Sequence, residues 1–156
     1  MKIIRFESID GKIYYGAYES KAAGFARVIQ GDIFGEFSVS KEKLEIRTPL
    51  APVSAPNVFA LGLNYGKHAD DTGLTHPDVP IVFLKASNTI TGLNSPIILP
   101  KAGPDEVDYE AELAVVIGTE AKNIAKEDAF RYILGYTCAN DISARDWQMR
   151  KQKGQW

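Results

Sequence analysis

Residues 107–118 carry the pattern that most limits how this chain can fold, Val-Asp-Tyr-Glu-Ala-Glu-Leu-Ala-Val-Val-Ile-Gly. Because successive side chains of a β-strand point to opposite faces, Tyr109 and every second residue after it share one largely apolar face. Glu110 and Glu112 share the other face, with their Cα atoms roughly 6.6 Å apart. The segment therefore predicts a strand with two neighbouring carboxylates on a face that turns apolar further along.

Two readings of Glu110 and Glu112 are open. On a buried face the two anions repel each other and lose their hydration, so a bound cation would stabilise them. Carboxylate oxygens are hard ligands, which favours Mg²⁺, with Mn²⁺ or Ca²⁺ as alternatives. The other reading is an edge strand whose outer face is wet, with two ordinary surface glutamates.

A second polar cluster follows the predicted strand 136–140, where the chain reads Asn-Asp-Ile-Ser-Ala-Arg-Asp-Trp-Gln. Asp141 is a candidate third carboxylate, and Arg145 and Gln148 lie three residues apart, on one face of a predicted helix 143–151. Ser143 with Asp146 resembles a capping box. The arginine fork suits a substrate carboxylate. In the alternative reading, Asp141 caps the helix and Arg145 is an exposed charge.

A third candidate is His68 with Asp71, three residues apart on a predicted helical turn that ends at Gly73. An acid beside a histidine orients the ring and raises its basicity, as general-base catalysis requires. Asp70 is a competing partner, and His76, in a loop before a proline, is assigned no role. The alternative is that His68 is a surface residue.

The remaining pattern predicts an α+β protein dominated by strands. Two prolines, Pro49 and Pro52, interrupt regular structure, so we place a boundary between a small N-terminal β lobe, residues 1–52, and a second domain, residues 53–156. The first lobe is expected to hold strands at 2–7, 12–17 and 25–29, with an Asp-Gly turn between the first two. The second domain is expected to hold strands at 57–63, 81–85, 107–118 and 136–140, an extended piece at 96–100, and helices at 64–71, 123–134 and 143–151.

Composition excludes several classes of protein. The formal net charge is −2 with no cluster of Lys and Arg, so we expect no nucleic-acid partner. No stretch approaches the ~20 apolar residues of a membrane span, and the N-terminus lacks the apolar run of a signal peptide. The single cysteine, Cys138, cannot form an internal disulfide. These observations predict a soluble, cytoplasmic protein.

Taken together, the motifs resemble the fumarylacetoacetate hydrolase family. The resemblance covers the chain from about residue 57 onward and is specific because the pieces occur in one order. They are Gly62-Leu63-Asn64-Tyr65 with His68, Phe83-Leu84-Lys85, Gly92 with Pro96-Ile97, Asp108-Tyr109-Glu110-Ala111-Glu112-Leu113, Gly135-Tyr136, and Asn140-Asp141-Ile142-Ser143-Ala144-Arg145-Asp146 with Gln148.

The resemblance implies a mixed β-roll in which Glu110, Glu112 and Asp141 bind one divalent metal, usually Mg²⁺. It implies that Arg145 and Gln148 line the substrate pocket and that His68 works with an acid on a lid. That acid is usually Glu, whereas Asp71 stands at the position here. Family substrates are small oxo acids such as acylpyruvates, and members take part in aromatic catabolism and commonly form homodimers.

The implied reaction is cleavage of a C–C bond by hydrolysis, in which His68 and Asp71 activate water and the metal stabilises the enolate that is left. Oxaloacetate decarboxylation and isomerisation of a 2-hydroxydienoate use the same enolate chemistry, and the residues do not choose among the three. Family members continue into a segment with a catalytic lysine, which this sequence does not contain. A second hypothesis is therefore an inactive truncated remnant, or a subunit that needs a complementing chain. We expect residues 1–156 alone not to form a stable, active monomer, and Lys85 is the first candidate to replace the lysine if they do.

Overall fold

The structure is a computed structural model and describes residues 1–19 and 24–151. It divides into two compact units, residues 1–28 with 40–95 and residues 29–39 with 96–156. Strands dominate both, as the sequence predicts. No helix among the described residues is long and apolar enough to cross a membrane.

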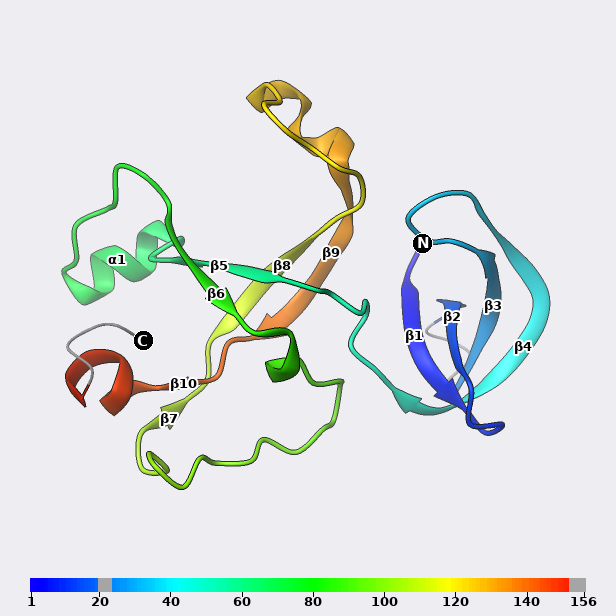
Figure 1. The fold of residues 1–156 in the computed structure, drawn as a ribbon, viewed down its shortest axis with the longest axis horizontal. Helices are drawn as coiled ribbons and strands as arrows, with labels where there is room; N and C mark the ends of the chain where they lie inside the picture. Colours follow the sequence, from blue (N-terminus) through cyan, green and yellow to red (C-terminus); the bar gives the residue numbers. More distant parts are fainter. Residues whose placement is uncertain (20–23, 152–156) are drawn as a thin grey trace. The chain divides into compact units, whose positions relative to one another are not determined.

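The N-terminal lobe is a small closed barrel of four strands in the order β1-β2-β3-β4 (Figure 1). These are β1 (Ile3–Ser8), β2 (Ile13–Tyr18), β3 (Phe25–Gly31) and β4 (Phe37–Pro49). The predicted hairpin between β1 and β2 is confirmed, with Gly11 of the Asp-Gly turn at a φ of 77°. β4 was not predicted from the sequence, because residues 41–43 are three consecutive charged residues within it. It ends at Pro49.

The barrel core forms around Phe6, which is fully buried, and small side chains complete the packing. Gly16 on β2 has to be a glycine because a Cβ there would lie 2.7 Å from the Cβ of Ala26 and 2.9 Å from the Phe6 ring. The other buried apolar residues of the lobe lie on β2, on β3 and in the turn after β3. They are Ala17, Ala26, Val28, Ile29 and Ile33.

Next along the chain, strands β5 (Val58–Gly62) and β6 (Ile81–Lys85) pair antiparallel, and the helix α1 (Gly66–Thr72) lies between them in sequence (Figure 1). Both strands and the helix were predicted. Gly73 ends α1 with a left-handed φ of 68°, and its N–H donates to helix carbonyls, as a C-terminal stop requires. A short 3-10 helix, η1 (Ser87–Thr89), follows, and the predicted extended piece 96–100 forms no strand.

The second unit contains the strand predicted at 107–118, which is broken into two. β7 (Val107–Asp108) pairs with β10 (Ser143–Ala144), and β8 (Ala111–Ile117) pairs with β9 (Ile133–Asn140). The break at residues 109–110 lets the two halves take different partners. Figure 1 shows β8 and β9 as a long antiparallel pair.

Two predicted helices were wrong in type or position. The helix predicted at 123–134 is a 3-10 helix, η2 (Lys126–Tyr132), because Asn123 has a left-handed φ of 55° and Ala125 is extended. β9 then begins at Ile133, earlier than predicted, because it pairs with β8.

The helix predicted at 143–151 begins only after Ala144, and its last part is a π-helical turn, η3 (Trp147–Lys151). Ser143 belongs to β10, and its hydroxyl donates to the Asp141 carbonyl, so the predicted capping box with Asp146 is wrong. Residues 152–156, the end of the predicted second domain, lie outside the described residues.

Candidate functional site

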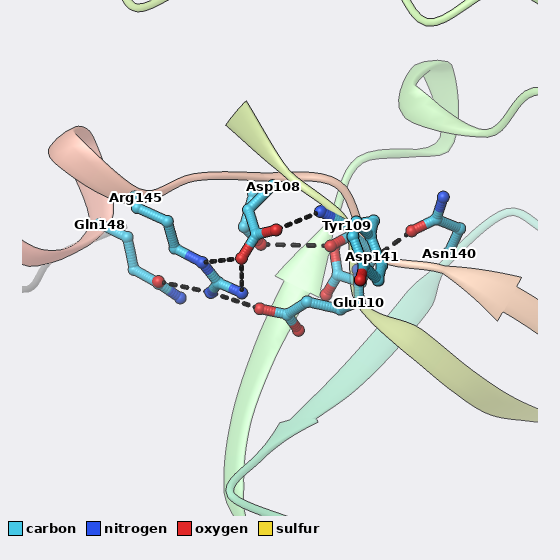
Figure 2. Close-up of polar contacts among 8 residues, drawn as sticks. Asp108, Tyr109, Glu110, Asn140, Asp141, Arg145 and Gln148 are labelled. Carbon is cyan, nitrogen blue, oxygen red and sulfur yellow. Dashed lines mark hydrogen bonds and ion pairs between the residues drawn. The ribbon is translucent and has the colours of Figure 1, made fainter. Parts of the chain in front are cut away.

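The predicted carboxylates meet where the β8–β9 hairpin opens. Ala111 pairs with Asn140 and Glu112 with Ala139, so the next position places Glu110 opposite Asp141. Two hydrogen bonds fix this register, from Asp141 N–H to the Glu110 carbonyl (2.9 Å) and from Glu110 N–H to Asn140 Oδ1 (3.0 Å). Opposite residues of an antiparallel pair share a face, as do alternate residues of one strand, so the three carboxylates belong to the same side of the hairpin. Figure 2 shows Glu110 and Asp141 at this end of the hairpin.

The carboxylate face is the less exposed face of β8. Glu110 and Glu112 are half-buried, and the Glu110 side chain retains 27% exposure. The alternate residues are exposed, among them Leu113, Val115 and Ile117. The two glutamates therefore do not lie on the wetter face, contrary to the surface reading of this strand.

Arg145 is the centre of the polar network beside these carboxylates (Figure 2). Its Nε and Nη2 donate to one oxygen of Asp108, at 3.1 and 3.0 Å. Its Nη1 donates to Glu110 Oε1 at 2.5 Å and to Gln148 Oε1 at 3.0 Å. The structure thus brings the predicted pair Arg145 and Gln148 together, and it links them to the carboxylate hairpin.

Asp108 is the residue of this network that the sequence analysis missed. It precedes Glu110 by two positions, so the alternation that marks Glu110 and Glu112 also includes it. Burial lowers the pKa of the Arg145 guanidinium, but the hydrogen bonds and charges of Glu110 and Asp108 outweigh burial and raise it. Arg145 therefore remains a cation in this network.

The donor set of Glu110, Glu112 and Asp141 fits a hard divalent cation, because all its ligand atoms are carboxylate oxygens. Like charges directly opposite each other on paired strands are destabilising, and Glu110 faces Asp141 in this way. Arg145 offsets only part of this negative charge. Within residues 1–19 and 24–151, however, no three His, Cys, Asp or Glu side chains are gathered closely enough to form a metal site as they stand.

His68 and Asp71 lie on α1, in the other unit, and both are exposed. Their side chains form no hydrogen bond or ion pair with each other in the described part of the chain. The imidazole–carboxylate pair that does form joins His76 Nε2 to Asp70 Oδ1 at 2.7 Å. His76 also borders an open groove of about 270 Å³ beside the β5–α1 turn. From the sequence, His76 was assigned no role and Asp70 was only a competing partner of His68.

Comparison with known proteins decides the family. The model of the fumarylacetoacetate hydrolase C-terminal domain matches residues 57–156, almost two thirds of the chain. The chain belongs to the fumarylacetoacetate hydrolase family. A second model, the Rv2993c-like N-terminal domain, matches residues 1–54. The family resemblance and the strand-dominated fold class predicted from the sequence are confirmed.

Members of the fumarylacetoacetate hydrolase family that resemble this chain include named enzymes. The mitochondrial oxaloacetate tautomerase fahd2 of Xenopus laevis is 46% identical over 108 residues, which are 69% of this chain and 34% of that protein. The fumarylacetoacetate hydrolase domain-containing protein 2 homolog of Dictyostelium discoideum is 51% identical over 106 residues, 68% of this chain and 34% of that protein.

Solved structures of the family share the fold. The 5-carboxymethyl-2-hydroxymuconate delta-isomerase of Mycobacterium smegmatis superimposes with a TM-score of 0.84 at 36% identity, over 100% of this chain and 60% of that chain. The fumarylacetoacetate hydrolase of Exiguobacterium antarcticum gives 0.71 at 29% identity, over 95% and 58%. The chain thus spans about a third of the two curated relatives above and about 60% of these solved chains.

Proposed function

We propose that the full-length protein is a divalent-cation-dependent enzyme that moves a proton next to the oxo group of a small 2-oxo acid. The reaction is either keto–enol tautomerisation or the shift of a double bond. The observation that carries the proposal is the cross-strand pair of Glu110 and Asp141, with Glu112 on the same face and Arg145 beside it.

The proposed roles follow from the chemistry of each side chain. Glu110, Glu112 and Asp141 hold the cation, with Mg²⁺ as first choice and Mn²⁺ or Ca²⁺ as alternatives. When bound, the cation acts as a Lewis acid that polarises the substrate's oxo group. Arg145 binds a substrate carboxylate through its fork of N–H donors, and Gln148 supports it from 3.0 Å.

The activities for which two relatives are named support an oxo acid as substrate. An oxaloacetate tautomerase and a 5-carboxymethyl-2-hydroxymuconate isomerase both act on small polycarboxylates whose oxo or hydroxy group lies next to a carboxylate. A face with clustered carboxylates beside one arginine suits such a substrate, because the cation and the arginine each take one negative group.

Hydrolytic cleavage of a C–C bond is the second candidate, favoured by the likeness to a fumarylacetoacetate hydrolase. In that reaction His68, oriented by Asp71, would activate the attacking water. The two exposed side chains would first have to turn toward each other. Oxaloacetate decarboxylation needs no water and stays an alternative of the same chemistry.

We further propose a domain boundary near residue 53, a homodimer as the working state of the complete protein, and a cytoplasmic location. An inactive remnant, or a subunit that a second chain completes, is the alternative from another class. The length of the gene product and its activity after purification distinguish an active enzyme from a remnant and from a subunit that needs a second chain.

The test is an assay of the purified full-length gene product, with and without Mg²⁺ or Mn²⁺, on three substrate classes. These are enol oxaloacetate, a 2-hydroxymuconate-type diene and an acylpyruvate, each followed by ultraviolet absorbance and product analysis. Cation-dependent loss of the enol or a double-bond shift is expected. Release of pyruvate from the acylpyruvate alone would favour the hydrolase, and no turnover of any class would contradict the proposed function.

A further inference from the structure

Arg145 has more partners than a substrate-binding arginine can keep. Of its five N–H groups, four are engaged, two by Asp108, one by Glu110 and one by Gln148. A substrate carboxylate that binds the fork needs two N–H groups. At least one present hydrogen bond must therefore break before Arg145 can bind such a substrate.

The three partners differ in what else they can bind. Glu110 lies opposite Asp141 on the carboxylate face, so a cation there would compete with Arg145 for its oxygens. Asp108 has a different position, because its backbone is paired with Ser143 in the β7–β10 ladder. The N–H of Arg145 itself donates to the Glu106 carbonyl at 2.8 Å. The same short ladder thus fixes the backbones of Asp108 and Arg145 relative to each other.

The two ends of the guanidinium are consequently held in different ways (Figure 2). At one end, Nε and Nη2 both donate hydrogen bonds to a single oxygen of Asp108. The other oxygen of Asp108 accepts the Tyr109 N–H at 2.9 Å. The Nη1 end contacts Glu110 and Gln148. A change of hydrogen-bond partner at the Nη1 end leaves both hydrogen bonds to Asp108 in place.

We propose that Asp108 is a positioning residue, which anchors Arg145 through Nε and Nη2 while the Nη1 end exchanges Glu110 for a substrate carboxylate. The inference rests on the proposed function, because it takes Arg145 as the carboxylate-binding residue. It makes Asp108 part of the specificity for dicarboxylates without requiring that Asp108 touch the substrate.

Two explanations of the role of Asp108 predict opposite changes in the affinity for a dianionic substrate when Asp108 is replaced by Asn. If Asp108 were only a nearby negative charge, Asp108→Asn would make the site more positive and would tighten the binding of a dianion. If Asp108 positions Arg145, the same variant lets the guanidinium rotate toward Glu110, and dianion binding weakens. The sign of the change therefore tests the proposal.

The experiment measures the KM for oxaloacetate and the calorimetric Kd of malonate, a non-reacting dicarboxylate, at saturating Mn²⁺ in the full-length protein. Asp108→Asn is expected to raise both roughly tenfold, in the range of a lost charge-assisted hydrogen bond, with a much smaller change in kcat. Asp108→Glu keeps the charge and should recover part of the loss. Asp128→Asn is the matched control, because Asp128 pairs with Arg131 at 2.9 Å on η2 and should leave both constants unchanged.

A double-mutant cycle with Arg145→Lys shows whether Asp108 acts through the arginine. In the Arg145→Lys background, Asp108→Asn should change the malonate Kd little. Thermal unfolding checks that each variant is folded, and Mn²⁺ titration checks that it binds Mn²⁺. A malonate Kd that falls or stays unchanged in Asp108→Asn, or full additivity in the cycle, would overturn the inference. If the wild-type protein binds malonate but does not turn over oxaloacetate, the proposed function fails while the malonate series still tests Asp108.

Discussion

Glu110 and Asp141 are joined by a backbone hydrogen bond of 2.9 Å that places their side chains on the same face at the open end of the β8–β9 hairpin. Thirty-one positions apart in sequence, they become neighbours because the hairpin register continues one step beyond the last paired residues. This relationship brings two separate sequence motifs together at one end of the hairpin.

Glu110→Gln should weaken Mn²⁺ binding, because it keeps the shape of the side chain and removes one of the clustered negative charges. We expect a loss of at least the roughly 10–100-fold that follows removal of a residue supporting a metal ligand. Mn²⁺ titration monitored by electron paramagnetic resonance gives the affinity. Glu120→Gln, an exposed glutamate of the same unit, is the matched control, and equal Mn²⁺ affinities in the two variants would contradict the assignment.

Asn140→Ala should loosen Glu110, because the Asn140 side chain accepts the Glu110 N–H at 3.0 Å. Loss of this solvent-accessible hydrogen bond should lower the free energy of unfolding by about 0.5–1 kcal/mol and weaken Mn²⁺ binding several-fold. Urea unfolding and the Mn²⁺ titration check both effects. Asn88→Ala, at an exposed position of η1, should change neither, and a normal Mn²⁺ affinity in Asn140→Ala would show that this hydrogen bond does not orient Glu110.

His68→Ala should separate hydrolysis from enol chemistry. General-base catalysis contributes roughly 10²–10⁴-fold, so the variant should lose that factor on an acylpyruvate and far less on oxaloacetate. Steady-state rates of the full-length protein on both substrates give the comparison. His76→Ala controls for the loss of an imidazole, since His76 pairs with Asp70 instead. An unchanged hydrolytic rate would remove His68 from the mechanism. Equal losses on both substrates would indicate that His68 acts in closing a lid over the substrate.

The apolar face of the β8–β9 hairpin should make residues 1–156 self-associate when purified alone. Leu113, Val115 and Tyr136 are 59%, 45% and 54% exposed, and Val115 lies directly opposite Tyr136. Exposed apolar faces of this kind favour association. Light scattering should detect assemblies that become smaller in the double variant Leu113→Lys, Val115→Lys.

The control for this association is Ile9→Lys, at an exposed apolar residue of the barrel lobe, which should leave the assemblies unchanged. A soluble monomer of residues 1–156 that unfolds cooperatively would refute the prediction. Turnover by such a monomer would direct attention to Lys85 as the substitute lysine.

The alternation of apolar and polar residues, together with the turn residues, was sufficient to predict much of the fold. The Asp-Gly turn, the β5–β6 strands and the helix that ends at Gly73 follow from local preferences, which the tertiary structure does not overrule. The strand β4 was missed because three consecutive charged residues, 41–43, stand before the alternation of residues 43–47. The helix predicted from Asn123 failed because pairing of β9 with β8 drew its last residues into a strand.

By itself the sequence determined which residues could carry the chemistry, because spacing and residue type mark Glu110, Glu112, Asp141 and Arg145, and their order identifies the family. Only the tertiary structure decided how these residues meet. Hairpin register sets Glu110 opposite Asp141, and the β7–β10 ladder brings Asp108 to Arg145 across 37 positions. Such pairings depend on strand register between distant segments, and that register is fixed only when one face of the strands is buried and the connections between them are formed.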